Sequence, residues 1–333
     1  MPRYLLLLLL CVAPLSQGVE CRPGGAELMS RPAGANGPTD VLVRLYVNDI
    51  VTIKDAEQSF IGDVLFRAEW LDPRLAHDGV VPCHAAADQI WTPVLQLLNR
   101  RHIERIRAPE LIVAPDGGVV FLLRSFGEFS FHADLTDFPF DSQTIGFNIV
   151  SSYSGDEVNL YTETSMIGVS DSLSVANWTI EIAGFVAGEQ YVAPVDKHLV
   201  RLDLLLDAKR LTGYYTWQQL VPLLLVVMMT WVVFWIPYEF VPPRVGLAAT
   251  SMLTLIAYRF AMSSVLPPIA YLTRLDIFMI GASILVFVGL AAAVAVTYIA
   301  EHHTTALAER VDHAARWLSP LGLLLVAGYA FYV

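Results

Sequence analysis

The sequence predicts an extracellular antiparallel β-sandwich of the immunoglobulin-like class joined to a four-helix transmembrane bundle. The chain of 333 residues is 55% hydrophobic and only 16% charged, whereas soluble domains carry about 25% charged residues. Residues 39–210 alternate apolar and polar positions in short runs, and residues 211–333 contain four long apolar stretches. We therefore expect one aqueous part and one membrane-embedded part.

The charge balance and the motif content exclude several classes of function. Lys and Arg number 21 against 32 Asp and Glu, a formal net charge of −11, and most of the acids lie in residues 19–210. A nucleic-acid binder needs a basic face, so no nucleic-acid partner is expected. The sequence shows no Ser/His/Asp order, paired-carboxylate motif, phosphate loop or set of metal ligands, so we expect no enzyme, no cofactor and no metal site.

Residues 1–18 predict a secretory signal peptide. Arg3 precedes an apolar run at residues 5–13, and Ser16 and Gly18 are small residues suited to the −3 and −1 positions of a cleavage site. The run is shorter than the roughly 20 residues that a membrane span needs. We expect the domain that follows to be exported.

A Pro/Gly-rich linker is expected at residues 19–38. The two cysteines outside the leader, Cys21 and Cys83, lie at the start of this linker and in a polar stretch. We expect them to form neither a disulfide framework nor a metal set.

Residues 39–210 predict the sandwich through short, alternating strands. Apolar residues alternate along 41–47, and the PDGG sequence at 115–118 predicts a hairpin turn between apolar runs on either side. Further strands are expected over residues 61–70, 144–150, 178–186 and 198–206. Many short strands without alternating helices favour an antiparallel sandwich.

Four apolar stretches predict membrane-spanning helices, since each is near the length needed to cross roughly 30 Å of hydrocarbon. They cover residues 217–236, 245–266, 275–300 and 317–333. Residues 301–316 are expected to be a short connection on the inner side. Basic residues are too evenly placed to orient the spans, so the topology depends on the signal peptide.

The second span carries a stripe of side chains on one face. At roughly 100° per residue, small, polar and then large apolar residues align. The stripe consists of Gly246, Thr250, Leu253, Ala257, Phe260 and Ser264. It is either a helix-packing seam or the lining of a pore built from several copies, with Thr250 hydrating ions and Leu253 to Phe260 forming a dewetting gate.

Several motifs decide between these interpretations. In chain order they are WLDPRL at 70–75, WTP at 91–93, FPFDSQ at 138–143, Arg210 before the first span, and PPRVGL at 242–247. Together they resemble the motifs of the pentameric ligand-gated ion channels, the Cys-loop receptor superfamily. Phe131 and Ile145 stand where that family's two loop cysteines would be. This departure and the short connection before the fourth span are similar to features of bacterial members of the family.

The resemblance implies a homopentameric ligand-gated ion channel. A small-molecule agonist, an amine or an amino acid, would bind between extracellular domains and open a pore lined by the second span. The implied partners are identical subunits, the agonist, permeant ions and the lipid bilayer. The implied location is the cell (inner) membrane, with several spans and an exported amino-terminal domain.

The resemblance also assigns roles to residues. The implied ligand-binding residues are Arg67, Arg124, Tyr153 and Tyr191. The implied coupling residues are Asp55, Glu57, Phe138, Pro139, Phe140, Asp141, Arg210 and Pro267. The implied selectivity filter is Pro242, Pro243 and Arg244. For Arg67 an alternative stays open, namely a surface ion pair with Glu69 or Asp63.

Charge selectivity has two opposing indications. Residues 242–247 resemble the PARVGL sequence of glycine and GABA receptors and contain no acid, which favours anions through rings of arginine and exposed backbone dipoles. The acidic exported domain favours cations, but its field is screened within about 10 Å. We expect anion selectivity. The alternatives are a cation-selective or proton-gated channel of the same family and a non-conducting, membrane-tethered sensor.

Overall fold

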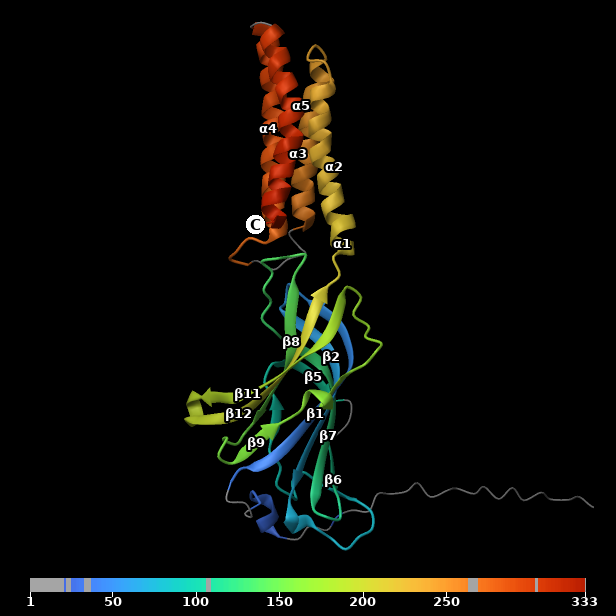
Figure 1. Cartoon of the computed structure of the whole chain (residues 1–333), viewed down its shortest axis with the longest axis vertical. Helices are drawn as coiled ribbons and strands as arrows, with labels where there is room; N and C mark the ends of the chain where they lie inside the picture. Colours follow the sequence, from blue (N-terminus) through green and yellow to red (C-terminus); the bar gives the residue numbers. More distant parts are fainter. Residues whose placement is uncertain are drawn as a thin grey trace, which may run out of the picture.

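A computed structural model describes residues 21, 25–32, 37–105, 109–262, 269–302 and 305–332. The predicted signal peptide, residues 1–18, lies outside the described residues. The molecule is elongated, with a sheet-rich half at one end and helices at the other (Figure 1). This division confirms the predicted fold class.

Two sheets form the sandwich. The larger one has the order β10-β1-β2-β7-β6-β3, with β5 also paired to β7 and β9 to β1, and the smaller one has the order β11-β12-β8-β4. The strands of the larger sheet are β1 (Thr39–Lys54), β2 (Ser59–Leu71), β3 (Cys83–Ala85), β5 (Arg100–Arg105), β6 (Glu110–Val113), β7 (Gly118–Ser130), β9 (Val158–Tyr161) and β10 (Ile167–Val169). The strands of the smaller sheet are β4 (Leu95–Leu97), β8 (Ser142–Ser151), β11 (Trp178–Val192) and β12 (Lys197–Arg210). All the predicted strands are present, and the long ones pair antiparallel. The short strands β9 and β10 pair parallel with β1.

Alternating side chains build the sandwich core. Val41, Val43, Leu45 and Val47 point inward from β1 and are at most 2% exposed. The predicted hairpin joins β6 to β7, where Gly117 has a φ of 86°, a value that side-chain-bearing residues rarely adopt. The period-two pattern therefore fixes the face that β1 buries. The turn residues fix the register of the hairpin that β6 and β7 form.

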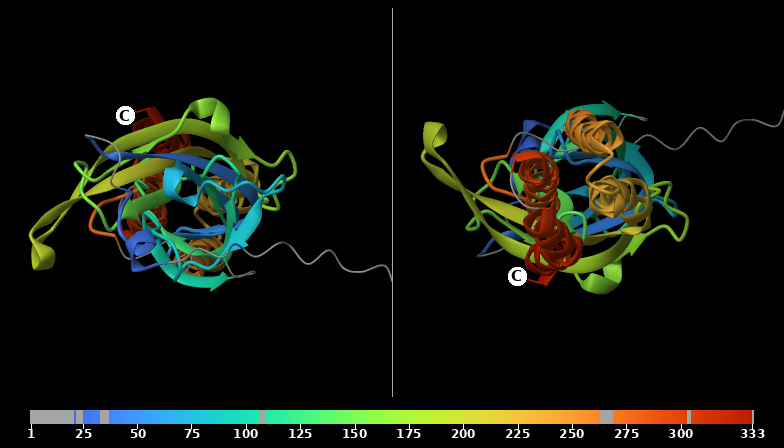
Figure 2. Two further views of the ribbon diagram at one scale, coloured as in Figure 1. Left: turned by 90° about the horizontal axis from the view of Figure 1, so that it is seen from below. Right: turned by 90° about the horizontal axis from the view of Figure 1, so that it is seen from above.

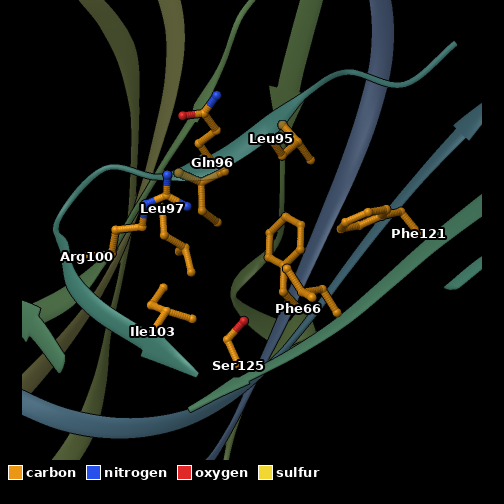
Figure 3. A pocket seen from close by; sticks show the side chains of 10 residues that line it. Phe66, Leu95, Gln96, Leu97, Arg100, Ile103, Phe121 and Ser125 are labelled. Atoms are coloured by element: carbon orange, nitrogen blue, oxygen red, sulfur yellow. The ribbon is translucent and has the colours of Figure 1, made fainter. Parts of the chain in front are cut away.

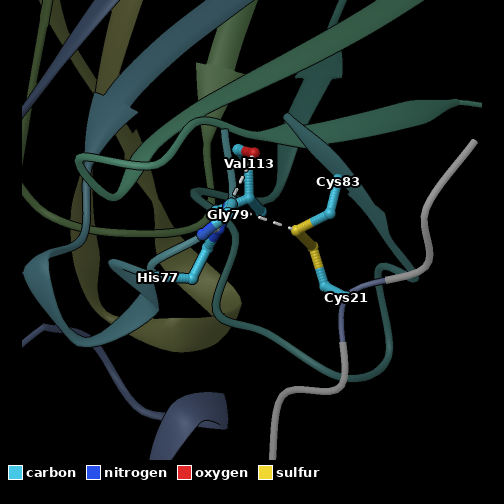
Figure 4. The surroundings of a disulfide bond; sticks show 5 residues. All are labelled: Cys21, His77, Gly79, Cys83 and Val113. Carbon is cyan, nitrogen blue, oxygen red and sulfur yellow. Dashed lines mark hydrogen bonds between the residues drawn. A yellow bond between two sulfur atoms is a disulfide. The ribbon is translucent and has the colours of Figure 1, made fainter. Parts of the chain in front are cut away.

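A disulfide joins Cys21 to Cys83 across a sequence separation of 62 residues (Figure 4). The expectation that these cysteines form no disulfide framework was wrong. Strand β3 pairs with β6 at an edge of the larger sheet, which brings Cys83 beside the amino-terminal segment, and the Cys21 N–H donates to the His84 carbonyl oxygen at 2.9 Å. Spacing in the sequence cannot reveal such a distant pairing.

Four helices long and apolar enough to cross a membrane follow the sandwich. They stand above it in Figure 1 and side by side in the end-on view from above (Figure 2). The first span, Gly213–Trp235, consists of α1 (Gly213–Tyr215), a π-helical turn (Thr216–Leu220), α2 (Val221–Val232) and a 3-10 turn (Val233–Trp235). The others are α3 (Val241–Met262), α4 (Arg274–His302) and α5 (Thr305–Tyr332).

The first span begins at Gly213, four residues before its predicted start, and two further boundaries also differ from the prediction. Helix α3 begins at Val241 because Pro242 and Pro243 are tolerated in a first helical turn, where their missing N–H groups would have no partner. The expected connection at 301–316 is almost entirely helical, since α4 ends at His302 and α5 begins at Thr305. Its Ala, Leu, Glu and Arg residues favour helix, but their polarity hides the helix from a hydropathy pattern.

A proline fixes how α5 meets the first span. Pro320 lies inside α5 and has no N–H to donate to the carbonyl oxygen four residues earlier. The Trp231 indole Nε1 donates to that oxygen, on Arg316, at 2.8 Å. A side chain of the first span thus satisfies the carbonyl that the proline leaves free.

Candidate functional site

The rest of the chain leaves one face of helix α3 uncovered. Arg244, Ala248, Ser251 and Leu255 are buried and face the neighbouring helices. Gly246, Thr250, Leu253, Ala257 and Phe260 are all exposed, with Leu253 at 69% and Phe260 at 76%. Ser264, the sixth residue of the predicted stripe, lies outside the described residues. The stripe is therefore not a packing seam between helices of the described chain.

Arg244 does not lie on that open face. Its side chain is completely buried, and its Nη2 donates to Asp312 Oδ1 on α5, while Nη1 donates to the Ile236 carbonyl oxygen at 3.1 Å. Pro242 and Pro243 are exposed beside it. The expectation that arginine side chains form a charged ring around a pore needs correction, because this guanidinium points into the helix bundle of its own chain.

The junction between sandwich and helices is built around Arg210 at the end of β12. Its Nε and Nη2 donate to the two oxygens of Asp141 at 2.7 and 2.9 Å, and its Nη1 and Nη2 donate to the two oxygens of Asp55 at 2.8 Å each. The side chains of Arg210, Asp141 and Asp55 are 1%, 2% and 12% exposed. The predicted pairing of Asp141 with Arg210 is thus confirmed.

The surroundings stabilise the charged form of Arg210. Burial by itself lowers the pKa of its guanidinium, but the hydrogen bonds and negative charges of Asp55 and Asp141 outweigh burial and raise the pKa. The guanidinium carbon also lies 4.1 Å from the Trp178 ring centroid and 4.8 Å from that of Phe138. Such cation–π contacts strengthen when the site is desolvated.

Two partners of this cluster were missed from the sequence. Gln143 Nε2 donates to Asp141 Oδ2 at 2.6 Å, and the Tyr215 hydroxyl accepts from Arg210 Nη1 at 3.2 Å. Gln143 belongs to the FPFDSQ motif, so its position was a usable signal. Tyr215 follows Arg210 by five residues and carries no comparable signal, because only the turn into the first span brings its ring back.

Residues 131–141 connect β7 to β8 and pack onto the helices. Phe138 is completely buried in a cluster with residues of all four spans, and the bond to Pro139 is cis. Phe140 is 49% exposed, and its ring lies 5.7 Å from that of Phe331 near the end of α5. Arg274, which begins α4, donates to Asp137 Oδ1 at 2.7 Å. This loop therefore touches both the sandwich junction and the helices.

The other predicted coupling residues behave differently. Asp55 points at Arg210 rather than at the connection before α4. Glu57 is exposed and lies 3.4 Å from Lys54 Nζ. Pro267 lies outside the described residues.

The predicted ligand arginines lie on the outer face of the larger sheet. Arg67 Nε donates to Glu69 Oε1 at 2.7 Å, and Arg44 Nε lies 3.0 Å from the same oxygen. An open hollow of about 520 Å³ lies between Arg44 and Arg67 on one side and residues 165–168 on the other. Two guanidinium groups sharing one carboxylate leave the hollow with excess positive charge.

Arg124 stands outside that hollow. Its Nε and Nη2 donate to the two oxygens of Asp63 at 3.1 and 2.6 Å. The hydrogen bonds and negative charge of Asp63 raise the pKa of this guanidinium. The side chain is nevertheless exposed, so it can exchange this partner for another.

The predicted ligand tyrosines lie in two different environments. Tyr153 accepts a hydrogen bond from Trp91 Nε1 at 2.9 Å, and the two rings lie 5.6 Å apart. Tyr191 is 50% exposed at the end of the β11–β12 hairpin, which projects from the sandwich (Figure 1). Its hydroxyl donates to Asp196 Oδ1 at 3.1 Å. Neither tyrosine lines the hollow beside Arg67.

A smaller cavity of about 50 Å³ lies inside the sandwich (Figure 3). Its lining is mainly apolar, with Phe66 and Phe121 among the residues, and Arg100 and Ser125 add polar groups. A space of this size holds a few waters at most. Within the described ranges, no group of three or more His, Cys, Asp or Glu side chains is placed to hold a metal ion.

Comparisons with known proteins agree with this architecture. The family model described as "Neurotransmitter-gated ion-channel ligand binding domain" matches residues 27–208, and the one described as "Neurotransmitter-gated ion-channel transmembrane region" matches residues 219–325. The gamma-aminobutyric acid receptor subunit beta-4 of Gallus gallus is 27% identical over 286 residues, which cover 83% of this chain and 58% of that relative. The aligned part thus spans little more than half the length of the relative. Because the two models cover most of the sequence, this chain belongs to the neurotransmitter-gated ion-channel family.

Proposed function

We propose that this chain is one subunit of a homopentameric ligand-gated ion channel whose pore is lined by the exposed face of α3. The observation that carries the proposal is the uncovered stripe from Gly246 to Phe260. A face that combines large apolar side chains with a threonine hydroxyl is matched neither to lipid alone nor to water alone, and the described helices of this chain leave it outside their bundle. Copies arranged around an axis would cover the flanks of the stripe and leave its centre toward the axis.

The stripe supports a gate within the proposed pore. Leu253 and Phe260 are its most exposed large side chains, and rings of such residues exclude water from a narrow passage. Thr250 lies one turn closer to the inner end, and its hydroxyl donates to the Gly246 carbonyl oxygen at 2.8 Å. The hydroxyl oxygen keeps lone pairs, and its orientation is fixed, so it offers a polar step below the apolar constriction.

Agonist binding between subunits is supported by two surfaces that one subunit cannot bring together. The hollow beside Arg67 carries excess positive charge, which suits a carboxylate. The projecting hairpin offers Tyr191 and His198, whose rings lie 5.1 Å apart. We propose that the hairpin of one subunit covers the hollow of the next, enclosing an amine or an amino acid. The relative named for gamma-aminobutyric acid fits this class.

Coupling would pass through the Arg210 cluster. Arg210 and Asp141 hold the base of the smaller sheet, Asp55 extends from the β1–β2 turn, and residues 131–141 rest on the helices. A movement of the hairpin along β12 reaches Arg210 directly, because Arg210 is the last residue of that strand. The cluster is a physical candidate for transmission, since it links the two layers through one buried group.

We propose anion selectivity from the absence of acids and from the helix dipoles at the inner mouth, without a ring of arginine side chains. Residues 241–258 contain no acidic side chain, and α3 begins at Val241, so each copy directs the positive end of its helix dipole toward the inner mouth. Arg244 and Arg316 share the single carboxylate of Asp312, which leaves this cluster of three residues with one positive charge in each subunit.

A planar-bilayer recording of the purified protein tests the proposal. With a salt gradient across the bilayer, amines, amino acids and pH steps are applied in turn. We expect current to begin with one of these stimuli and to reverse near the chloride equilibrium potential. Reversal that follows the cation gradient would instead support a cation channel, activation by pH alone would support proton gating, and no current would support a non-conducting sensor.

A further inference from the structure

Asp312 on α5 binds two arginines from different places in the chain. Arg244 Nη2 donates to its Oδ1, and Arg316 Nη2 donates to its Oδ2 at 3.0 Å. Asp312 is 3% exposed and Arg244 is fully buried. One carboxylate therefore neutralises one of two buried or half-buried guanidinium groups, and the cluster keeps a single positive charge.

The same two arginines close the end of the first span. Arg316 Nε donates to the Phe234 carbonyl oxygen at 2.8 Å, and Arg244 Nη1 donates to that of Ile236 at 3.1 Å. Carbonyl groups in the last turn of a helix lack partners within it, so these bonds satisfy groups that would otherwise be unpaired. The cluster therefore connects α5 to the turn that leads into α3.

Arg244 is held mainly by Asp312. Its Nε is buried and has no hydrogen-bond partner within the described part of the chain. Nη1 donates to a neutral carbonyl, and the guanidinium carbon lies 5.8 Å from the Phe234 ring centroid. Helices α3 and α5 otherwise pack on α4 and α2 rather than on each other. The side chain of Asp312 thus decides whether the Arg244 guanidinium stays inside the subunit.

We propose that Asp312 is a specificity-determining residue that sets the positive charge at the inner mouth of the pore, both by its own carboxylate charge and by holding the Arg244 guanidinium away from the ion path. The inference rests on the proposed channel function. Without the carboxylate, an unpaired buried guanidinium is unfavourable, and Arg244 lies only two residues before Gly246, which is exposed on the stripe. Arg244 then turns toward the ions that it now avoids.

Charge variants test this through the reversal potential in a sodium chloride gradient. Asp312→Asn keeps the side-chain shape and adds one net positive charge to each subunit, so the chloride-to-sodium permeability ratio should rise roughly threefold or more. Arg244→Gln removes one positive charge and should lower the ratio by a similar factor. The double variant Arg244→Gln/Asp312→Asn should return toward the original ratio.

Two controls separate this role from a purely structural one. Glu309→Gln makes the same charge change at an exposed residue of α5, where salt screens it, so its shift should be much smaller. Asp312→Glu keeps the charge and should keep the selectivity. If Asp312→Asn does not assemble, the double variant is compared with Arg244→Gln, because these two variants differ only in the charge at residue 312. The double variant should then be the more anion-selective of the two.

Equal reversal potentials in all assembled variants would overturn the inference, as would equal shifts in Glu309→Gln and Asp312→Asn. Either result would leave the channel proposal standing. A wild-type protein that carries no current would instead refute the channel proposal, and the two failures are therefore distinguishable.

Discussion

Replacing Arg210 by alanine would remove the one cation between two buried carboxylates. Asp141 and Asp55 would lose four charge-assisted hydrogen bonds, all between 2.7 and 2.9 Å. Breaking a buried ion pair by removing one partner costs about 3–5 kcal/mol. A domain of this size shifts its melting temperature by roughly 2–4 °C for each kcal/mol, so we expect Tm to fall by roughly 6–20 °C.

A matched control lies on the same strand. Arg201 Nε donates to Asp203 Oδ1 at 2.7 Å, but the two side chains are 28% and 18% exposed. An ion pair that water reaches contributes about 1 kcal/mol or less, so Arg201→Ala should lower Tm by no more than about 4 °C.

Thermal unfolding of the detergent-solubilised protein, followed by tryptophan fluorescence, measures both variants. Neutralising the acids as well, in Arg210→Met/Asp55→Asn/Asp141→Asn, should recover part of the loss because no buried charge is left unpaired. Any Arg210→Ala subunits that assemble should fail to open when an activating stimulus is applied. An Arg210→Ala variant that is no less stable than Arg201→Ala would refute this account of the junction.

Three further predictions follow from other parts of the molecule. Leu253→Ser should wet the constriction and give leak current in a bilayer, whereas Ile256→Ser should not, because Ile256 lies off the stripe. Equal leak in both variants would contradict the assigned pore face. Reducing the Cys21–Cys83 disulfide releases a loop of 62 residues and should destabilise the sandwich by about 4 kcal/mol on the loop-entropy model. An unchanged denaturant midpoint in the presence of reductant would argue against this stabilising role of the disulfide. The hydrogen bond from Ser59 lowers the pKa of Glu128 below its ordinary 4.5. This contact therefore stabilises the fold above the unfolded-state pKa, and its contribution is lost as the pH falls through the folded-state pKa. Ser59→Ala should flatten the acid limb of the Tm-versus-pH curve, and an unaltered limb would exclude this cause.

Local patterns in the sequence predict most of the elements. The alternation along residues 41–47 identifies a strand and its buried face, because successive side chains of a strand point to opposite faces of the sheet. Apolar stretches identify the four spans for a similar reason, since only helices satisfy the backbone in lipid. The helical start of α5 escapes this logic, because charged residues interrupt the apolar pattern of residues 305–316 and the partner of the buried Asp312 is Arg244 from another helix.

The candidate site was predictable only where a motif carried both partners. Asp141 and Arg210 stood in recognisable motifs, so their pairing could be predicted. Asp55 lies 155 residues from Arg210, and its carboxylate turned out to face that arginine and not the connection before α4. Arg244 was assigned to the pore because its motif named it, yet Asp312, 68 residues away, draws the side chain inward. Side-chain direction depends on such distant charges, which spacing does not show.

Cysteine accessibility tests the central claim, that the uncovered face of α3 lines an ion pathway. Cys21 and Cys83 are joined and Cys11 lies in the predicted signal peptide, so an introduced cysteine supplies the reactive thiol. Thr250 is exposed on the stripe, and Ser251, its neighbour, is completely buried. We predict that a charged methanethiosulfonate reagent blocks the current of Thr250→Cys channels and spares that of Ser251→Cys channels. Block of Ser251→Cys with no effect on Thr250→Cys would contradict the account.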